Sequence, residues 1–425
     1  MRKAKVLASL VVLNFMTAGM GLPLTGEDGK LSGSNIMPVV FALVAGVFFF
    51  SERNTIDRRL LRFFLAFNVA CCVSFLIFLA RYAWDPNFPV LFFQDVEIVF
   101  CMLLWWFAQA HPEEFHAAVR TGILWSLPVA AAFAWYDIHT GEPWISFGMD
   151  DKSQAAVLMC CEGYILIRFF GGTFDRFIGI ALYVATYLTI SRLPVFFLPP
   201  ILFALMRGSR YAAPVTIIGT CIVAVIVVTM GDTLQTIFAV YNRLSSVEAL
   251  TGSSSNTAHL LLLQSALRMK FSDPWAFLFG IGPGNFSKAL TSFPISVAEI
   301  ESLDPQLVAF AREGKAPLHS LPMQILLDYS FVVFLLFAFY LLRAFRFLLQ
   351  RRNLSDILFF VGFLLASMFY SLHNKSYFYL IITTVGSLLK HAQPFSQATC
   401  TKAATTETNR PLNSPMSTHM TGCGE

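Results

Sequence analysis

His319 has the sequence position expected of a general base. It stands in the stretch A-P-L-H-S-L-P-M-Q, immediately before a hydrophobic run. A neutral histidine at the start of a helix can accept a proton from a hydroxyl group. The alternative is a surface histidine without a chemical role, and spacing alone leaves both readings open.

A glycine-rich turn precedes His319 in the sequence. Gly280, Gly282 and Gly284 alternate with other residues in F-G-I-G-P-G-N-F. A dinucleotide-binding loop needs a preceding strand and an acidic residue about 20 positions further on. Nothing around this motif resembles that unit. We therefore predict a tight turn, because glycine adopts backbone angles that other residues rarely reach.

A helix is predicted over about 256–271, just before the glycine turn. Asn256 is its candidate N-cap, with Gly and Ser residues ahead of it. Arg268 lies four residues after Gln264, so the two should share one side of the helix. The residues on another side would be Leu260, Leu263 and Leu267. We expect this helix to lie at the membrane surface, as an interfacial helix or lid.

The elements that must position these residues are membrane helices. The chain has 425 residues, of which 56% are hydrophobic and only 13% charged, and its mean hydropathy is +0.63. Globular proteins carry about 25% charged residues. This composition excludes a water-soluble enzyme and a disordered scaffold and argues against a secreted disulfide module. The net charge of +4 gives no reason to expect nucleic acid as a partner.

Hydrophobic runs predict an all-α polytopic membrane protein with about twelve spans. The first run resembles a signal peptide but lacks a cleavage site, so we expect it to be retained. The run 177–206 is too long for one span, and basic flanks indicate two crossings that turn near Arg192. The predicted spans are about 5–24, 35–51, 60–80, 89–110, 118–136, 153–170, 177–190, 193–206, 211–230, 319–342, 354–371 and 376–390.

Basic residues predict that both termini lie in the cytoplasm. Of 30 Lys and Arg residues, 19 fall in segments assigned to the inside and 5 in short outer loops. The remaining 6 lie in one long exported loop. The predicted divisions are helices over 1–230, a periplasmic loop over 231–318, helices over 319–390 and a disordered cytoplasmic tail over 391–425.

Cysteine positions predict neither disulfides nor zinc. Six cysteines fall in predicted spans and two in the tail, so none is in an exported loop. No spacing of Cys and His residues suggests a zinc site. Charged residues inside predicted spans are a separate signal of function or of helix pairing, and both readings stay open. These residues are Asp95, Glu97, Glu162 and Arg168, and Lys152 just before the sixth span is a candidate phosphate ligand.

The order of these features resembles the O-antigen ligase and O-antigen polymerase superfamily of bacterial envelope glycosyltransferases. The resemblance covers roughly 150–375. Its specific parts are Ser191-Arg192, the G-I-G-P-G-N-F turn in a long exported loop, and His319 with Gln324 opening the tenth span. It implies about a dozen spans, an inner-membrane location, and neither a metal nor a nucleotide cofactor. It also implies transfer of a glycan from undecaprenyl pyrophosphate to an acceptor hydroxyl, on a glycan or on lipid A-core, at the periplasmic face.

The resemblance implies a role for several residues. Arg192 and Arg268 would stabilise the pyrophosphate leaving group, with Arg243 an alternative to Arg268. His319 would deprotonate the acceptor hydroxyl, and Gln324 would hydrogen-bond sugar. The glycine turn would place the loop over the site. Three positions depart from the family pattern, namely Leu193, Ser320 and Asp328.

Two other classes of protein remain as alternatives. Twelve spans also occur in flippases and other transporters, although those usually divide into two halves with repeat symmetry, and we find no repeat. A noncatalytic component of an envelope assembly complex is the third reading. The sequence does not separate polymerase from ligase and does not identify the sugar, the linkage or the oligomeric state.

Overall fold

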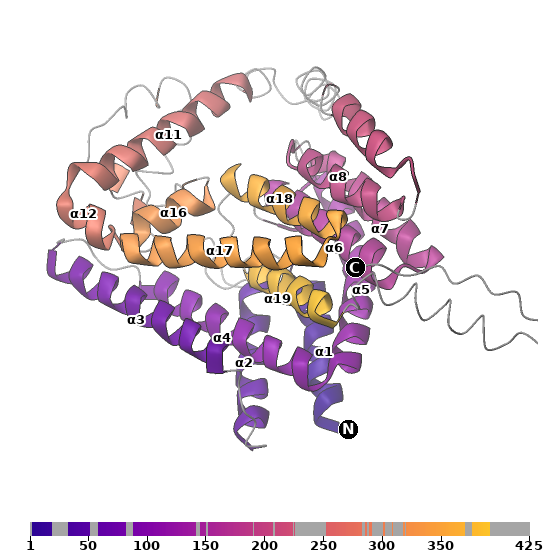
Figure 1. The fold of residues 1–425 in the computed structure, drawn as a ribbon, viewed down its shortest axis with the longest axis horizontal. Helices are drawn as coiled ribbons and strands as arrows, with labels where there is room; N and C mark the ends of the chain where they lie inside the picture. The colour runs from indigo at the N-terminus through magenta and orange to yellow at the C-terminus, as the bar shows by residue number, and fades with distance from the viewer. Residues whose placement is uncertain are drawn as a thin grey trace, which may run out of the picture.

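A computed structural model shows the fold (Figure 1). It describes residues 2–391 apart from 19–32, 52–57, 82–87, 142–144, 150–151, 190, 207–208, 224, 226–251, 283–284, 287–288, 291–300, 302–307, 309–317, 319 and 370–375. All regular secondary structure within the described residues is helical. The predicted all-α class is therefore confirmed. Arg243, Gly284, His319 and the tail lie outside the described residues.

The first half of the chain forms eight labelled α-helices. A π-helical turn, η1 (Leu166–Phe170), extends α6, and a 3-10 turn, η2 (Thr186–Thr189), extends α7. A further apolar helix spans Ala212–Val223. The eight are α1 (Arg2–Thr17), α2 (Gly33–Ser51), α3 (Arg58–Arg81), α4 (Phe88–Ala110), α5 (Pro112–Thr140), α6 (Lys152–Ile165), α7 (Thr173–Ala185) and α8 (Pro194–Leu205).

The second half supplies the helices around the candidate site. In Figure 1, α11 and α12 lie at the left of the view, and α7 and α8 lie at the right. The labelled helices are α11 (Gly252–Ser272), α12 (Pro274–Phe279), α16 (Leu321–Asp328), α17 (Phe331–Arg351), α18 (Leu354–Phe369) and α19 (Ser376–His391).

Small residues let the helices of the first half approach closely. Gly163 on α6 faces Gly179 on α7, and a Cβ added at either would lie 2.7 Å from the other's carbonyl oxygen. On α5, a Cβ at Gly122 would lie 2.8 Å from Cβ of Phe15 on α1. Close approach at small residues is a common way for helices to associate in membranes. The main hydrophobic core runs through these contacts.

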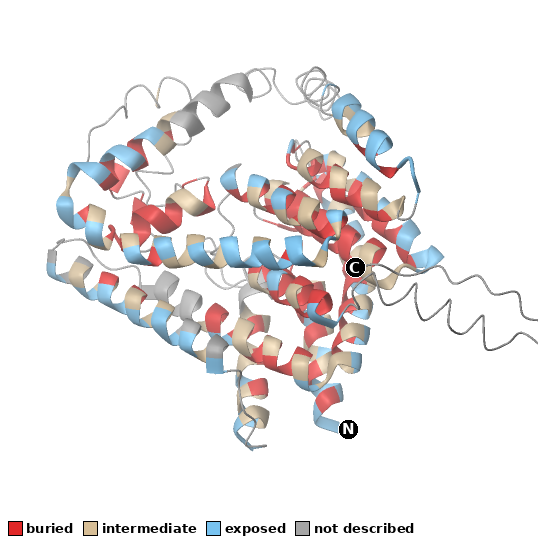
Figure 2. Ribbon diagram, in the orientation of Figure 1, coloured by how far each residue is buried: buried red, intermediate tan, exposed pale blue. Residues whose placement is uncertain are grey.

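Several helices expose apolar side chains as a membrane protein does. Within the described residues, three helices are long and apolar enough to cross a membrane: Pro112–Thr140, Lys152–Phe170 and Phe331–Arg351. Figure 2 shows α17 mostly in the colours of exposed and intermediate residues. Its exposed residues include Val332, Leu335, Phe339 and Leu342. Lipid, rather than water, suits such a surface.

Polar contacts tie together helix ends that the charge distribution assigns to the same side of the membrane. Each contact joins two helix ends that the prediction assigns to the same side, and which side faces the cytoplasm stays a prediction. The pairs are Lys3–Ser51 at 3.3 Å, Arg120–Asp175 at 2.8 Å, Arg168–Asp356 at 2.8 Å and Arg351 to the Lys390 carbonyl at 3.5 Å.

One predicted span, 319–342, differs from the observed helices, whereas α8 (Pro194–Leu205) lies within the predicted span 193–206. The run predicted as one span over 319–342 is broken at Tyr329 and Ser330, which have extended backbone angles. Ser330 caps the new helix, because its side chain accepts a hydrogen bond from the Val333 amide at 3.2 Å. Helix α8 has 12 residues, or about 18 Å at 1.5 Å per residue. It is therefore shorter than the membrane's hydrocarbon core of about 30 Å.

Candidate functional site

Helix α11 has its own small hydrophobic core. Leu262, Ala266 and Met269 are buried and pack with residues of α12, the glycine turn and α16. The sequence predicted that Leu263 and Leu267 would lie on the apolar side of the helix. The buried positions, Leu262 and Ala266, are each one residue earlier, and Leu267 is exposed. Four consecutive leucines precede Gln264, so apolar spacing does not define the register there. Arg268 and Gln264 are exposed, as expected for a shared outer side.

The glycine turn follows α12 because that helix is started and ended by specific residues. Asp273 caps its start, with its Oδ1 accepting from the Trp275 amide at 3.0 Å. Gly280 ends it at φ +84°, and Gly282 has φ +82°. Only glycine adopts such angles readily. The predicted tight turn is therefore present at the described glycines.

This turn packs backbone against backbone on the end of α16. The Ile281 amide donates to the Leu327 carbonyl at 2.9 Å, and the Gly282 amide donates to the Asp328 carbonyl at 3.0 Å. A Cβ at Gly280 would clash with the Asp328 carbonyl. The last carbonyls of a helix have no partner within it. The glycine turn supplies those partners, which explains why the loop attaches at this point.

Lys270 supplies the next hydrogen bond. Its Nζ donates to the Tyr329 carbonyl at 2.9 Å, at the break between α16 and α17. The side chain is fully buried, which is rare for lysine unless it is paired. A cation at a helix C-terminus is favourable because the helix dipole is negative there. We call Lys270, Gly280, Gly282, Asp328 and Tyr329 the Lys270 joint.

The electrostatics of the joint are set by burial and by one carboxylate. Burial lowers the pKa of Lys270 from 10.5 to about 8, while the nearby charge of Asp328 opposes that shift. Asp328 is also fully buried, and its Oδ2 accepts from Gln324 Nε2 at 3.2 Å. Gln324, predicted to bind sugar, therefore has its amide directed at Asp328 in this structure.

The residues on either side of His319 lie at the start of α16, at the opposite end of that helix from the joint. These residues, Leu318 and Ser320, are both buried. The Ser320 carbonyl accepts from the Gln324 amide at 2.9 Å, which begins α16. The Ser320 hydroxyl is buried without a hydrogen-bond partner among the described residues. The chain on both sides of His319 is thus attached to the start of α16.

The other predicted ligands belong to different elements. Arg192 is exposed in the turn between η2 and α8. Helix α8 packs on α18 and α6, and Figure 1 shows it to the right of α11. Lys152 is the first residue of α6, a helix that packs on α7 and α8. The structure therefore brings Gly280, Gly282 and Gln324 to one joint and places Arg268 on the outer side of α11. It does not bring Arg192 or Lys152 there.

Lys270 was missing from the residues predicted by sequence. A usable signal was present, because Leu262, Ala266 and Lys270 are spaced four apart and share one helix face. A lysine in register with apolar positions is a candidate for burial. Asp328 was noted only as a departure from the family pattern.

The intramembrane charges divide into two kinds. Arg168 makes a bidentate pair with Asp356, at 2.8 and 3.0 Å, and Tyr164 donates to the same carboxylate. This is helix pairing between α6 and α18. Glu162 Oε2 accepts from Ser126 at 3.0 Å, whereas Oε1 is buried without a hydrogen-bond partner among the described residues. Glu97 is buried on α4, and the Asp95 side chain lies outside the described residues.

Comparisons with other proteins add no family. Within the described residues, no three His, Cys, Asp or Glu side chains are grouped to hold a metal ion. Comparisons with family models, with curated proteins and with solved structures find no match to this chain. Functional inference therefore rests on the joint and on the sequence motifs.

Proposed function

We propose that this protein is a bacterial inner-membrane glycosyltransferase. It would move a glycan from undecaprenyl pyrophosphate to an acceptor hydroxyl at the periplasmic face, as an O-antigen or exopolysaccharide polymerase or as an O-antigen ligase. The twelve-span arrangement with both termini inside belongs to this proposal. So do the partners, which are the lipid-linked donor, a glycan or lipid A-core acceptor, and other polysaccharide assembly proteins.

The Lys270 joint is the observation that carries the proposal. It attaches the loop segment to a break in a membrane helix. Irregular backbone at membrane depth is tolerated only where it is buried in protein or lines a cavity. Here the break is covered by Lys270 and by the glycine turn. The residues on both sides of His319 lie at the start of α16, and the joint lies at its end, so one short helix connects the glycine turn with the segment of the candidate base.

The chemistry assigns one role to each predicted residue. His319 takes the proton of the acceptor hydroxyl, whose oxygen then attacks the anomeric carbon of the donor sugar. The bond from that carbon to the pyrophosphate oxygen breaks, and undecaprenyl pyrophosphate leaves with the bonding electrons. Arg268, exposed on α11, stabilises the departing charge, because a guanidinium pairs with phosphate oxygens and keeps its proton. Arg192, Arg243 and Lys152 are secondary candidates for the same role.

A reconstituted reaction tests this function. The full chain in lipid nanodiscs is given an undecaprenyl-pyrophosphate-linked oligosaccharide, and mass spectrometry follows both the enlarged glycan and free undecaprenyl pyrophosphate. His319→Ala and Arg268→Ala should each lower turnover by at least about a hundredfold. Gln264→Ala is the matched control for Arg268, since it lies one turn earlier and is also exposed. Equal turnover in all four proteins contradicts the roles of His319 and Arg268, and no turnover by the unmodified protein contradicts the proposed function.

The acceptor separates the two forms of the reaction. A second lipid-linked glycan as acceptor reports polymerase activity, and lipid A-core as acceptor reports ligase activity. In cells, loss of a ligase leaves long chains on the undecaprenyl carrier. Loss of a polymerase leaves single repeat units attached to the outer-membrane lipid.

A flippase or other transporter is the second candidate, and the broken helix favours it. Discontinuous helices with polar groups at the break form the substrate sites of many transporters. Helices α16 and α17 have that form. Transport of a lipid-linked glycan across proteoliposomes, unchanged in His319→Ala and Arg268→Ala, would support this candidate over the enzyme.

A further inference from the structure

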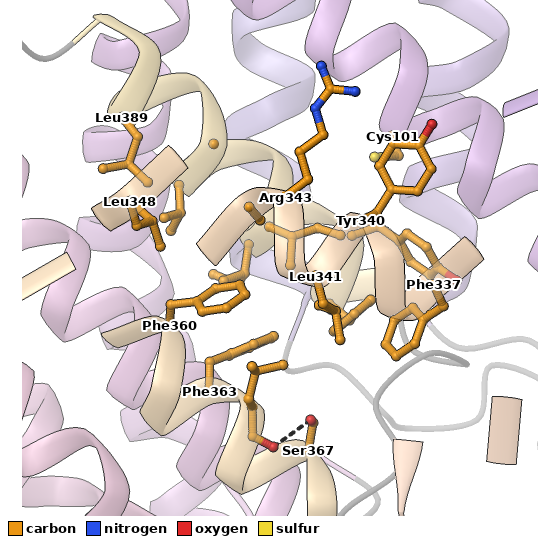
Figure 3. Close-up of a pocket in the computed structure, with 18 of the residues that line it drawn as sticks. Cys101, Phe337, Tyr340, Leu341, Arg343, Leu348, Phe360, Phe363, Ser367 and Leu389 are labelled. Carbon is orange, nitrogen blue, oxygen red and sulfur yellow. Dashed lines mark hydrogen bonds between the residues drawn. The ribbon is translucent and has the colours of Figure 1, made fainter. Parts of the chain in front are cut away.

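A large apolar cavity lies between α17 and the helices α4, α18 and α19. Its volume is about 790 Å³, within the range of sites that hold small molecules. Figure 3 shows Phe360 and Phe363 extending from α18 toward α17, with Phe337, Leu341 and Leu348 on α17 itself. The walls are mostly aromatic and aliphatic side chains.

The cavity exists because α17 stands away from its neighbours. Only Val333 and Leu348 are buried among its 21 residues. A cavity with such walls does not hold ordered water, which needs several polar partners. In a bilayer the available filling is a hydrocarbon chain.

Three charged residues line the cavity, and all three come from parts of the chain predicted to lie on the cytoplasmic side. Arg343 on α17 and Lys390 on α19 both line it. Lys390 Nζ lies 5.7 Å from the centre of the Trp105 ring, and its carbonyl accepts from Arg351 at 3.5 Å. The acidic residue in the wall, Asp356, is held by Arg168 at 2.8 Å. Because that carboxylate is paired with Arg168, the charged residues of the cavity wall leave an excess of positive charge.

Another part of the cavity lies at α16 and the Lys270 joint. Leu321, Ile325 and Tyr329 line it there. Arg343 comes twelve residues after Phe331 on α17, or about 18 Å along the helix at 1.5 Å per residue. A phosphate held at Arg343 is therefore separate from any pyrophosphate held at the joint.

We propose that this cavity binds one acyl chain of an anionic phospholipid, with the lipid phosphate against Arg343 and Lys390. Basic pockets between membrane helices near the cytoplasmic surface bind anionic head groups. Arg343 belongs to a basic segment that also contains Arg346, Arg351 and Arg352, on the side predicted to be cytoplasmic. The chain would fill the space between α17 and α18 and reach toward α16. This site does not depend on the proposed glycosyl transfer.

Lipid retention by the intact protein tests the site. The full chain is purified from membranes containing phosphatidylglycerol and phosphatidylethanolamine, and native mass spectrometry measures the lipid that remains bound. The double variant Arg343→Gln/Lys390→Gln should retain about thirtyfold less phosphatidylglycerol, since each of the two basic residues contributes about 1 kcal/mol to anionic binding. Arg346→Gln is the matched control, being exposed on the same helix without lining the cavity.

A second variant tests the apolar part. Ala344 lines the cavity and is also exposed, so Ala344→Trp should occupy space without disrupting the core. It should lower the retained lipid severalfold while the protein stays monodisperse in size-exclusion chromatography. The proposal is overturned if phosphatidylglycerol retention is equal in all variants. It is also overturned if phosphatidylethanolamine is retained as well as phosphatidylglycerol, or if a polyprenyl phosphate displaces the phospholipid.

Discussion

Helices α6 and α17 belong to the same membrane protein but are packed in opposite ways. Of the 14 residues of α6, 12 are buried, whereas α17 buries two of its 21. Helix α6 meets α7 at facing glycines, and η1, which extends α6, is joined to α18 by the buried ion pair Arg168–Asp356. Helix α17 borders a cavity of about 790 Å³ and begins at a break. We call the region around α6 the tight side and the region around α17 the loose side. Under the two proposals, the loop, the segment that carries His319 and a lipid would meet on the loose side.

Filling the α6–α7 contact should have the largest effect. Gly163→Val puts methyl groups where even a Cβ lies 2.7 Å from the Gly179 carbonyl. Backbone atoms cannot move aside as the end of a flexible side chain can. The free energy of unfolding should therefore fall by about 3 kcal/mol or more. Thermal unfolding in detergent and the yield of monodisperse protein measure this. The matched variant Ala344→Val on the loose side should change the melting temperature little. A similar fall in melting temperature for both variants would mean that the two sides do not differ in packing.

Removing one partner of the Arg168–Asp356 ion pair should cause the second-largest loss of stability. Arg168→Gln leaves the buried Asp356 carboxylate without its bidentate partner and should destabilise by about 3 kcal/mol. The matched control is Arg120→Gln, which breaks the pair with Asp175. Arg120 is 43% exposed against 10% for Arg168, so this loss should be at most about 1 kcal/mol. Equal destabilisation would mean that burial does not distinguish the pairs.

Removing the lysine of the joint should have a smaller and more local effect. Lys270→Met keeps the apolar stem but removes the buried hydrogen bond to the Tyr329 carbonyl, which costs about 1–3 kcal/mol. Hydrogen exchange should increase in α11 and α16 and stay unchanged in α6. Arg268→Met, two residues away and exposed, should leave exchange at α16 as it is. Faster hydrogen exchange throughout the protein, including α6, would show that the joint stabilises the whole fold and not only the loose side.

Local patterns predicted most of the helices and the turn, because they act over a few residues. The runs that became α2, α3, α4 and α19 are bounded by polar or basic residues, and their ends agree within a few positions. The glycine turn follows from glycine's backbone freedom. The break at Tyr329 does not follow from its neighbours, since the Lys270 bond that covers it spans 59 residues. Neither the separation of Arg192 from α11 nor the cavity beside α17 is encoded in local spacing.

Raising the pH should strengthen the joint modestly. Burial lowers the pKa of Lys270 to about 8 in the docked state, whereas an exposed lysine has a pKa of about 10.4. Between these values the undocked state binds a proton that the docked state has released, so docking becomes more favourable as pH rises. The gain from pH 7 to 9 should be about 1 kcal/mol. The neutral amine still donates to the Tyr329 carbonyl, so the hydrogen bond survives deprotonation.

Hydrogen exchange at α11 and α16, corrected for intrinsic rates, measures this dependence. Protection there should rise between pH 7 and 9 in the unmodified protein and stay level in Lys270→Met. Protection at α6 serves as the internal reference. If protection at α16 instead falls through pH 8 only when Lys270 is present, the ammonium charge itself holds the joint. In that case the charge of Asp328, rather than burial, has the larger effect on the pKa of Lys270. The loose side would then depend on a Lys270–Asp328 ion pair, as the tight side depends on Arg168–Asp356.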